Sequence, residues 1–486
     1  MNLKNLLGKT DYRAGNYADR DITGICYDSR KCFPGCLFVA LCGSVTDGAR
    51  YIDEAINKGA VAVVSEGDLN LPENTVGIKT ENANNALGEL SSVFYGNPSE
   101  KMIIAGITGT SGKTTVSNII YSIFSADGKK CGLIGTIENR IGSYTEKATH
   151  TTPLSADLQK LFRRMADENV GMCAIEVSSH ALDQGRVYGT EFDCGVFLNI
   201  ARDHLDYHKT IENYRNAKLK LFSYYPKHQK KTFTAVVNYD EDLFGCVKKV
   251  FGGKIITFGR NPQADVCALN EKVGVGSVEF DLKYRDETVH IVFNMGGAFN
   301  VSNALAGAAV AISSGVDLET VKEGIEKCVP VRGRFQSIDC GQDFSVIIDY
   351  AHTPDEIEKL LKSVKNLNKK RIISVFGCGG NRDRGKRPIM GQIACANSDM
   401  AIITSDNPRD EEPLDIIKDI TDGLEGFGNY RIVADRAEAI KTALGSAEKD
   451  DIVVIAGKGH EDYQIVKNTK HHFDDAEQVR NFFDKK

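Results

Sequence analysis

Residues 102–116, M-I-I-A-G-I-T-G-T-S-G-K-T-T-V, contain an apolar run, a glycine-rich loop and the start of a helical pattern. The run Met102–Ala105 predicts a strand, and apolar residues from Val116 to Ile123 recur at the spacing of a buried helix face. Glycines in such a loop let backbone N–H groups converge on an anion, and the helix N-terminus adds positive partial charge. The stretch therefore predicts a strand, a phosphate-binding loop and a helix.

The loop carries the side chains expected of a nucleoside triphosphate site. The strict P-loop pattern requires a glycine five residues before Gly112, where this chain has Ile107, so the match is a variant. Lys113 is expected to reach the outer phosphates, and the Thr114 hydroxyl to bind Mg²⁺. A glycine-rich turn with a chance Gly-Lys-Thr is the alternative, but the strand and helix flanks favour a nucleotide site.

Length and composition place the chain among ordinary globular proteins. Its 486 residues suffice for about three domains of ~150 residues each. A formal net charge of -6 gives no general attraction to nucleic acid or acidic membranes. The N-terminus has no basic-then-apolar signal, and no apolar run approaches the roughly 20 residues of a membrane span. We expect a cytoplasmic protein that binds neither nucleic acid nor membranes.

The cysteines show no disulfide framework. Thirteen are scattered along the chain, an odd number that indicates reduced thiols. Cys26, Cys32, Cys36 and Cys42 are close in sequence but lack a C-x-x-C pair, and residues 36–42 predict a buried strand. We therefore expect these four to serve as small apolar residues rather than as zinc ligands.

Apolar runs and turn signals predict an α/β protein of three domains. Residues 1–100 alternate short apolar runs with helical stretches, which predicts a small N-terminal α/β domain. Residues 101–331 predict a central P-loop ATPase-like parallel-sheet domain, with a linker at Val329–Phe335. Residues 332–486 again alternate apolar runs with helical segments, which predicts a C-terminal Rossmann-like domain with a mostly parallel sheet.

Polar residues follow apolar runs in the central domain. Glu176 ends one run, and His204 follows the next. Because such strand ends line the ligand crevice of open α/β sheets, we expect both residues beside a metal bound to phosphate. Lys218 and Lys220 lie on a helix predicted over residues 214–222, where a solvated charged face is the default interpretation.

Charged or glycine-rich loops follow the four apolar runs of the C-terminal domain. Loops after parallel strands share one edge of the sheet, so their charged residues are expected to converge. These residues are Arg382, Asp406, Arg409 and Glu461. Two arginines and two acids suit an amino acid, because guanidinium pairs with carboxylate and acidic oxygens with ammonium. Solvated surface loops are the alternative.

Together these stretches resemble the Mur ligases, the cytoplasmic enzymes that build the peptide of bacterial peptidoglycan. The resemblance covers essentially the whole chain and rests on Gly106–Thr115, Glu176–His180, Arg202–His208, Asp349–His352 and Asp406–Arg409, which occur in the family's order. The variant phosphate loop is the family's own form. The resemblance implies an ATP-dependent amide ligase that activates a carboxylate as an acyl phosphate.

The resemblance also implies roles for individual residues. The catalytic residues would be Lys113, Glu176, His204 and Lys218. The ATP-binding residues would be Gly109, Thr110, Ser111, Gly112, Lys113, Thr114, Thr115, Asn303, Arg334 and Asp349. The residues that bind the UDP-linked substrate would be Tyr27, Ser29, Ser44, Val45, Thr46, Thr151, Thr152, Ser178, Gln184 and Arg186. The amino-acid-binding residues would be Arg382, Asp406, Asn407, Pro408, Arg409, Gly457 and Glu461.

Two Mg²⁺ sites are implied, one at Thr114 and a second around Glu176 and His204. Lys218 matches the lysine that the family carbamylates with CO₂, which replaces the default of a solvated charge. An ammonium group would repel magnesium, whereas a carbamate supplies a bidentate anion. The implied metal set is therefore Thr114, Glu176, His204 and Lys218.

The implied acceptor is the γ-carboxyl of D-glutamate in UDP-MurNAc-L-Ala-D-Glu. Arg409 stands where the lysine-adding branch of the family usually has a residue unable to pair with a carboxylate. Because meso-diaminopimelate has a second carboxylate at its far end, we expect it to be the added amino acid, with an L-lysine-adding enzyme as the alternative. We expect a monomer whose partners are ATP and these small-molecule substrates.

Three other functions are compatible with parts of the pattern. A folylpolyglutamate-type ligase shares the phosphate loop and carbamate chemistry, but it is not expected to carry Asp406–Arg409 or Gly457–Glu461. A P-loop kinase or nucleotide switch would pass phosphate to another acceptor or use it to gate a conformation. A catalytically silent binding protein is disfavoured because all four catalytic residues are present.

Overall fold

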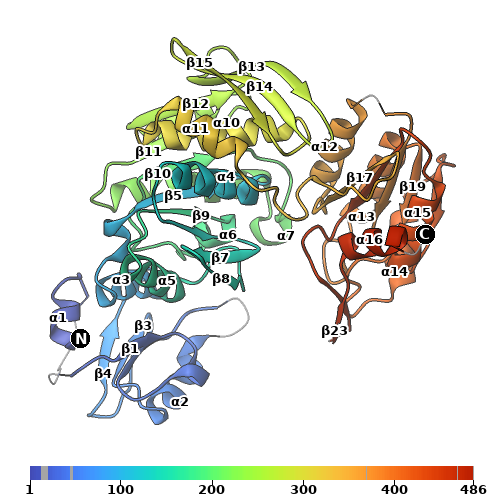
Figure 1. Ribbon diagram of the computed structural model, residues 1–486. Helices are drawn as coiled ribbons and strands as arrows, with labels where there is room; N and C mark the ends of the chain where they lie inside the picture. Colours follow the sequence, from blue (N-terminus) through green and yellow to red (C-terminus); the bar gives the residue numbers. More distant parts are fainter. Residues whose placement is uncertain (13–19, 44–46, 368, 468, 485–486) are drawn as a thin grey trace. The chain divides into compact units, whose positions relative to one another are not determined.

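The computed structural model describes residues 1–12, 20–43, 47–367, 369–467 and 469–484 (Figure 1). The chain forms two compact units. The first comprises Met1–Gly109, Asp127–Leu198 and Glu212–Ile256, and the second comprises Thr110–Ala126, Asn199–Ile211 and Thr257–Lys486. Each unit is an α/β structure, as predicted, whereas the three-domain division stays a prediction.

The N-terminal part of the first unit is a four-stranded parallel sheet in the order β1-β2-β3-β4. Helix α3 begins where the Asn82 side chain accepts a hydrogen bond from the Asn85 amide, and its apolar face packs on the sheet with Leu37, Val64 and Leu90 in one core. The elements are α1 (Leu3–Leu7), β1 (Gly24–Cys26), η1 (Ser29–Lys31), β2 (Cys36–Val39), η2 (Gly48–Tyr51), α2 (Ile52–Asn57), β3 (Ala62–Ser65), β4 (Val76–Lys79), α3 (Ala83–Phe94) and η3 (Pro98–Lys101).

The rest of the first unit is built on strands in the order β11-β10-β5-β9-β6-β7-β8. The first five run parallel, and β7 and β8 extend the sheet as antiparallel strands. Ile107 of β5 pairs with Glu176 of β9, so Glu176 lies at the end of a central strand. The elements are β5 (Ile103–Thr108), β6 (Cys131–Ile134), β7 (Glu138–Ile141), β8 (Tyr144–Lys147), α5 (Ser155–Asp167), β9 (Met172–Glu176), α6 (Ser179–Asp183), β10 (Cys194–Phe197), α8 (Ile211–Ser223), η4 (Tyr225–Lys227), β11 (Thr234–Asn238) and α9 (Phe244–Val250).

In the second unit, the helix that follows the phosphate loop packs against two later helices, α10 and α11 (Figure 1). The packing is close because a Cβ at Gly307 would overlap the Ile119 side chain, and one at Gly324 would overlap the backbone of Ile123. Strands β13, β14 and β15 are antiparallel, which the sequence analysis did not predict. The elements are α4 (Lys113–Ala126), α7 (Leu205–His208), β12 (Lys254–Gly259), β13 (Val266–Val273), β14 (Val278–Tyr284), β15 (Glu287–Phe293), α10 (Phe299–Ser313) and α11 (Leu318–Glu326).

The C-terminal part of the second unit is a six-stranded sheet in the order β16-β17-β21-β18-β19-β20. It is parallel except for β16, which confirms the predicted mostly parallel sheet. Ile347 and Ile348 belong to different cores, because successive strand residues point to opposite faces and helices cover both. The elements are β16 (Gln336–Ser337), β17 (Ser345–Asp349), α12 (Pro354–Lys365), β18 (Ile372–Phe376), α13 (Lys386–Asn397), β19 (Met400–Ile403), α14 (Pro413–Thr421), β20 (Tyr430–Ile432), α15 (Arg436–Ser446), β21 (Ile452–Ala456), β22 (Tyr463–Val466), β23 (Thr469–His472) and α16 (Asp475–Asp484).

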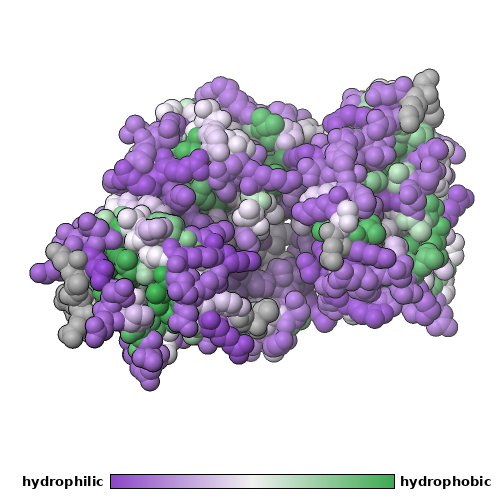
Figure 2. Space-filling model, turned by 90° about the horizontal axis from the view of Figure 1, so that it is seen from below, coloured by the Kyte–Doolittle hydropathy of each residue, from purple (hydrophilic) through white to green (hydrophobic). Residues whose placement is uncertain are grey.

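The face shown in Figure 2 is predominantly hydrophilic, with separate apolar patches. Among the helices of the described residues, none combines the length and the apolar character needed to cross a membrane.

Candidate active site

The predicted strand, glycine-rich loop and helix at residues 103–126 are all present. β5 ends at Thr108, and α4 begins at Lys113. Gly112 has a φ of +85°, a conformation that side-chain-bearing residues rarely adopt, and its carbonyl oxygen accepts the first helical bond from the Val116 amide at 2.9 Å. Lys113 Nζ donates to the Thr110 carbonyl oxygen at 2.8 Å, so its ammonium group lies over the loop.

Asn199, which the sequence analysis did not single out, holds the phosphate loop. Its Oδ1 accepts hydrogen bonds from the backbone amides of Thr110 and Ser111, both at 3.0 Å. Its Nδ2 donates to the Ser111 carbonyl oxygen at 3.1 Å. The sequence could have indicated Asn199, because it follows the apolar run of β10 and strand ends supply site residues in α/β sheets.

The other predicted ATP-binding residues lie in the second unit. Arg334 Nη2 donates to Thr114 Oγ1 at 3.3 Å, which brings Arg334 to the start of α4, and its phosphate contact stays a prediction. Asp349 ends β17 and accepts the amides of Phe335 at 2.7 Å and Ala351 at 2.8 Å; desolvation raises the pKa of its carboxyl group to about 6. The third of these residues, Asn303, lies on α10, and its Nδ2 donates to Asn300 Oδ1 at 2.8 Å.

The carboxylate of Glu176 is fully buried at the end of β9. Its Oε1 accepts the Thr136 amide at 3.0 Å, and its Oε2 accepts the Thr136 hydroxyl at 2.9 Å. A Cβ at Gly135 would overlap Glu176 Oε1, so glycine leaves the room that this carboxylate occupies. The Thr136 hydroxyl gives its one proton to Glu176, so its oxygen accepts from the Thr151 hydroxyl 3.1 Å away, which links Glu176 to a residue predicted to bind the UDP-linked substrate.

Four other residues predicted to bind that substrate form one hydrogen-bonded group in the first unit. Thr152 Oγ1 donates to the Glu176 carbonyl oxygen at 2.8 Å and accepts the Ser178 amide at 3.1 Å. Arg186 donates to Gln184 Oε1 at 2.7 and 2.9 Å and to the Thr152 carbonyl oxygen at 3.2 Å. The structure therefore brings Thr151, Thr152, Ser178, Gln184 and Arg186 together beside Glu176.

The N-terminal residues of the predicted set lie after β1. The Tyr27 hydroxyl donates to Asp157 Oδ2, and burial together with that carboxylate raises the pKa of Tyr27. The Ser29 hydroxyl donates to Glu54 Oε2 at 2.6 Å. Ser44, Val45 and Thr46 lie outside the described residues.

The predicted metal set is divided between the two units. Lys218 lies in the first unit, is 1% exposed and donates from Nζ to the Gly109 carbonyl oxygen at 2.7 Å, so it is not a surface residue. His204 lies in the second unit, with a φ of +53° and an Nε2 atom 3.3 Å from Asp203 Oδ2. With Glu176 in the first unit and Thr114 in the second, the metal set stays a prediction.

The loops after β19 and β21 meet at one edge of the C-terminal sheet, as predicted. Asn407 Nδ2 donates to Glu461 Oε2 at 2.8 Å, and the buried Lys458 donates to Asn407 Oδ1 at 3.2 Å and to Glu461 at 3.0 Å. Gly457 has a φ of +116°, and a Cβ there would lie 2.9 Å from Asp406 Oδ2. Lys458 is a positioning residue that the sequence analysis missed, although it lies within the range Gly457–Glu461 named there.

Arg382 and Arg409 converge at the same edge. A Cβ at Gly379 would lie 2.8 Å from Arg409 Nη1 and 3.8 Å from Arg382 Cγ. Among the described residues neither guanidinium is ion-paired: Arg409 Nη1 donates to the carbonyl oxygens of Gly380 at 2.8 Å and Asn407 at 3.4 Å, and Arg382 donates to a neighbouring carbonyl oxygen. Burial and the charge of Arg382 lower the pKa of Arg409. Two neighbouring positive charges favour the binding of an anion between them.

Arg387, also missed, supports the loop that carries Arg382. It is completely buried at the start of α13. Its guanidinium donates to both carboxylate oxygens of Glu411 at 2.8 Å and to Asp419 at 2.7 Å. It also donates to the Gly379 carbonyl oxygen at 3.3 Å. Because its charge is matched by two acids, Arg387 fixes the loop rather than attracting a further anion.

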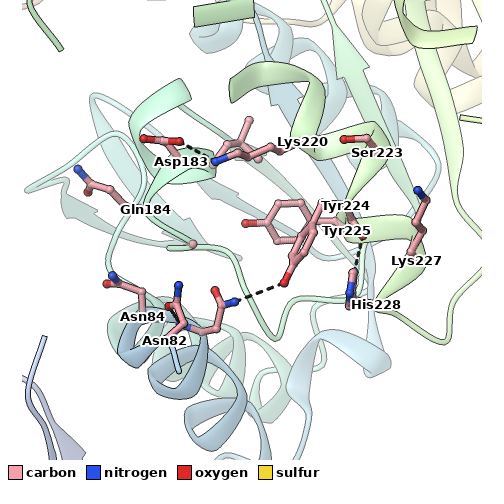
Figure 3. A pocket seen from close by; sticks show the side chains of 13 residues that line it. Asn82, Asn84, Asp183, Gln184, Lys220, Ser223, Tyr224, Tyr225, Lys227 and His228 are labelled. Carbon is pink, nitrogen blue, oxygen red and sulfur yellow. Dashed lines mark hydrogen bonds and ion pairs between the residues drawn. The ribbon is translucent and has the colours of Figure 1, made fainter. Parts of the chain in front are cut away.

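A cavity of about 550 Å³ lies in the first unit between the ends of α6 and α8 and the start of α3 (Figure 3). Lys220 and Asp183 form an ion pair of 2.6 Å at its wall, and Asn85 Nδ2 donates to the Tyr224 hydroxyl at 3.3 Å. Of the predicted substrate residues, only Gln184 is among its described lining residues. Through Gln184 the cavity adjoins the hydrogen-bonded group around Glu176.

Three family descriptions match successive parts of the chain. Residues 21–95 match "Mur ligase family, catalytic domain", residues 107–311 match "Mur ligase middle domain", and residues 333–459 match "Mur ligase, glutamate ligase domain". A protein of Clostridium acetobutylicum named UDP-N-acetylmuramoyl-L-alanyl-D-glutamate--2,6-diaminopimelate ligase 1 is 45% identical over 99% of both chains.

Solved structures show the same fold. A structure titled as a UDP-N-acetylmuramoyl-L-alanyl-D-glutamate--2,6-diaminopimelate ligase is 33% identical, covers 96% of this chain and 95% of its own, and has a TM-score of 0.69. The MurF ligase from Thermotoga maritima in complex with ADP has a TM-score of 0.64 at 18% identity, with 95% and 97% of the two chains covered. At that identity the second likeness concerns the fold alone.

Replacing Asn199 by alanine is expected to weaken nucleotide binding without unfolding the chain. The Thr110 and Ser111 amides would lose their shared acceptor, so kcat/KM for ATP should fall about 10- to 100-fold, mainly through KM. Steady-state kinetics at saturating concentrations of the other substrates measure this. Asn429→Ala is the matched control, because Asn429 donates to the carbonyl oxygens of Cys395 and Ser398 at the end of α13. Equal KM values for ATP in both variants would contradict the role of Asn199.

Proposed function

This chain belongs to the Mur ligase family, and on that premise we propose that it joins 2,6-diaminopimelate to the γ-carboxylate of D-glutamate in UDP-MurNAc-L-Ala-D-Glu at the expense of ATP. The observation that carries the proposal is the relative of that name at 45% identity over 99% of both chains. The charges gathered at the C-terminal sheet edge support the choice of amino acid. The product is an amide of the growing peptidoglycan peptide.

The reaction begins with activation of an inert acid. A carboxylate oxygen attacks the γ-phosphorus of ATP, the bond to ADP breaks, and an acyl phosphate forms. Two anions must approach each other in this step, so positive groups around the phosphates lower its barrier. Lys113 supplies such charge beside the loop, and Asn199 holds the loop by accepting the Thr110 and Ser111 amides.

The second step forms the amide. The neutral amine of the incoming amino acid attacks the acyl carbon, and the tetrahedral intermediate expels phosphate. The amine becomes nucleophilic only after it has lost its proton, which passes to solvent or to a basic side chain. The hydrogen-bonded group of Thr152, Ser178 and Arg186 would orient the sugar-peptide whose carboxylate reacts.

The donor set of the proposed metal sites fits magnesium in its chemistry. Thr114 offers a hydroxyl and Glu176 a buried carboxylate, and oxygen atoms are the ligands that Mg²⁺ prefers. His204 and a carbamate on Lys218 complete the proposed set. Magnesium bound there would neutralise phosphate charge. Lys218 already lies against the loop through Gly109, so conversion of its ammonium to a carbamate would reverse the charge at that point.

The C-terminal loops support an amino acid with two carboxylates. Arg382 and Arg409 offer guanidinium groups that no acid of the described residues neutralises by ion pairing, so they suit the distal carboxylate of diaminopimelate. Asp406 is buried, and its Oδ2 has no hydrogen-bond partner among the described residues, so it suits an ammonium group. Asn407 donates a hydrogen bond to Glu461, which joins the loop after β19 to the loop after β21.

Oxygen-isotope tracing tests the proposed reaction. With ¹⁸O in the D-glutamate γ-carboxylate, one labelled oxygen is expected in each phosphate released, because that oxygen bridges carbon and phosphorus in the acyl phosphate. Mass spectrometry of the phosphate measures the transfer. If product formed while the released phosphate carried no label, the acyl-phosphate mechanism would be wrong. Phosphate release in the absence of the sugar-peptide would favour a kinase or switch instead.

Replacing Arg409 by asparagine is expected to remove the preference for diaminopimelate. Loss of the charge-assisted bonds to the distal carboxylate should lower kcat/KM for meso-diaminopimelate by roughly 100- to 1,000-fold. An amino-acid panel that includes L-lysine measures the selectivity. Arg384→Asn is the control, because Arg384 is 66% exposed and pairs with Asp419 at the surface. Wild-type enzyme that used L-lysine as fast as diaminopimelate would refute the assignment of Arg409.

Replacing Lys218 by alanine tests the carbamate. Activity is expected to fall on the order of 100- to 1,000-fold, and a short carboxylic acid in the buffer should restore part of it by filling the vacated anion position. Lys220→Ala is the matched control on the same helix, because Lys220 forms an exposed ion pair with Asp183. A Lys218→Ala enzyme with undiminished activity would remove the carbamate from the mechanism.

A further inference from the structure

Three cysteine thiols converge beside the N-terminal sheet. The Sγ atoms of Cys26, Cys32 and Cys36 all lie within 4.8 Å of one another. The sequence analysis expected small apolar residues here, because the spacing lacks a C-x-x-C pair. Their burial agrees with that expectation, since Cys26 and Cys36 belong to an apolar core with Phe38. Burial alone does not explain why the three sulfur atoms face one another.

Backbone geometry produces the convergence. β1 and β2 are parallel, and Gly24 pairs with Cys36, so Cys26, two residues after Gly24, lies on the same face of the sheet as Cys36. The chain between them turns through η1, which Asp28 caps by accepting the Arg30 amide, and the Cys32 amide donates to the Ser29 carbonyl oxygen at 3.2 Å. This turn returns Cys32 to the two strand cysteines.

We propose that Cys26, Cys32 and Cys36 form a three-thiolate site for one zinc-class cation. Thiolate sulfur is the ligand preferred by such d¹⁰ cations, and three protein ligands plus one solvent position is an established coordination pattern for zinc. Binding exchanges three S–H bonds for three S–metal bonds and releases three protons to solvent. No oxidant or reductant takes part, because every sulfur keeps its oxidation state.

The dimensions suit this ligand set. Zinc–sulfur bonds of about 2.3 Å in tetrahedral geometry place sulfur atoms roughly 3.8 Å apart, so the trio has to contract by at most about 1 Å. The present partners of the sulfurs are weak: Cys26 Sγ lies 3.6 Å from the Lys31 carbonyl oxygen and Cys32 Sγ 3.8 Å from that of Asp28. Cys32 is partly exposed, which gives a cation a route in and solvent a fourth position.

The site lies beyond the chemistry of the proposed function. The turn between Cys26 and Cys32 carries Tyr27 and Ser29, whose side chains bond to Asp157 and Glu54 rather than to the thiols. The thiols of the trio therefore take no part in the bonds of these two side chains. The proposal does not depend on ligase activity, and its test reads metal binding and stability only.

Cobalt(II) is the probe, added to the full chain after reduction and removal of metals under anaerobic conditions. We expect one cobalt per chain with thiolate charge-transfer absorption and the intense visible bands of tetrahedral cobalt, both displaced by one equivalent of zinc. Loss of an outer-shell partner alone weakens metal binding roughly 10- to 100-fold. Cys32→Ser should therefore weaken zinc binding by at least about 100-fold.

Cys42→Ser is the matched control, because Cys42 is exposed in the same region and lies outside the trio. It should bind cobalt like the wild type, and zinc should raise the thermal midpoint of both but not of Cys32→Ser. Cys32 is partly exposed, so Cys32→Ser should fold even where a variant of the buried Cys36 does not. Unchanged cobalt spectra in Cys32→Ser, or a wild type without thiolate absorption, would overturn the site.

Discussion

Two backbone amides of the glycine-rich loop converge on a single side-chain oxygen, Asn199 Oδ1, and this contact fixes the conformation of the proposed nucleotide site. A glycine-rich loop has many accessible conformations, so ordering it on binding alone would cost free energy. The Asn199 amide nitrogen also donates to the Ser111 carbonyl oxygen. Arg334 donates to the Thr114 hydroxyl at the start of the next helix. These bonds order the loop in advance, and in the proposed function that order would lower the cost of nucleotide binding.

The C-terminal loops show a different use of charge. Arg387 is buried but matched by two acids, so it serves the fold. Arg382 and Arg409 lie nearby, and burial with like charge lowers the pKa of Arg409. Asp406 keeps one buried oxygen without a partner among the described residues. A folded protein tolerates such uncompensated groups where a ligand of opposite charge satisfies them, and a zwitterionic amino acid with an extra carboxylate has the required groups.

Much of the fold followed from local patterns. The run from Met102 predicted β5 and α4, and alternation of apolar runs with helices predicted the parallel C-terminal sheet. The antiparallel strands β13–β15 were not predicted, because period-two alternation identifies a strand but not its partner or direction. Local spacing also failed for Lys218. Its position on a predicted helix indicated a solvated surface charge, whereas packing buries the side chain against Gly109. Only the family resemblance assigned Lys218 a role at the site.

The sequence by itself determined which residue types follow each strand, and hence the phosphate loop, the family and the set of charged loops. Tertiary structure alone decided which of these side chains meet. Asn199 and Lys458 became visible as positioning residues only through hydrogen bonds to loops 88 and 51 residues away in sequence. Cys26 and Cys36 meet because β1 and β2 pair in one register. Such contacts depend on strand pairing and turn geometry, which no local spacing of residues encodes.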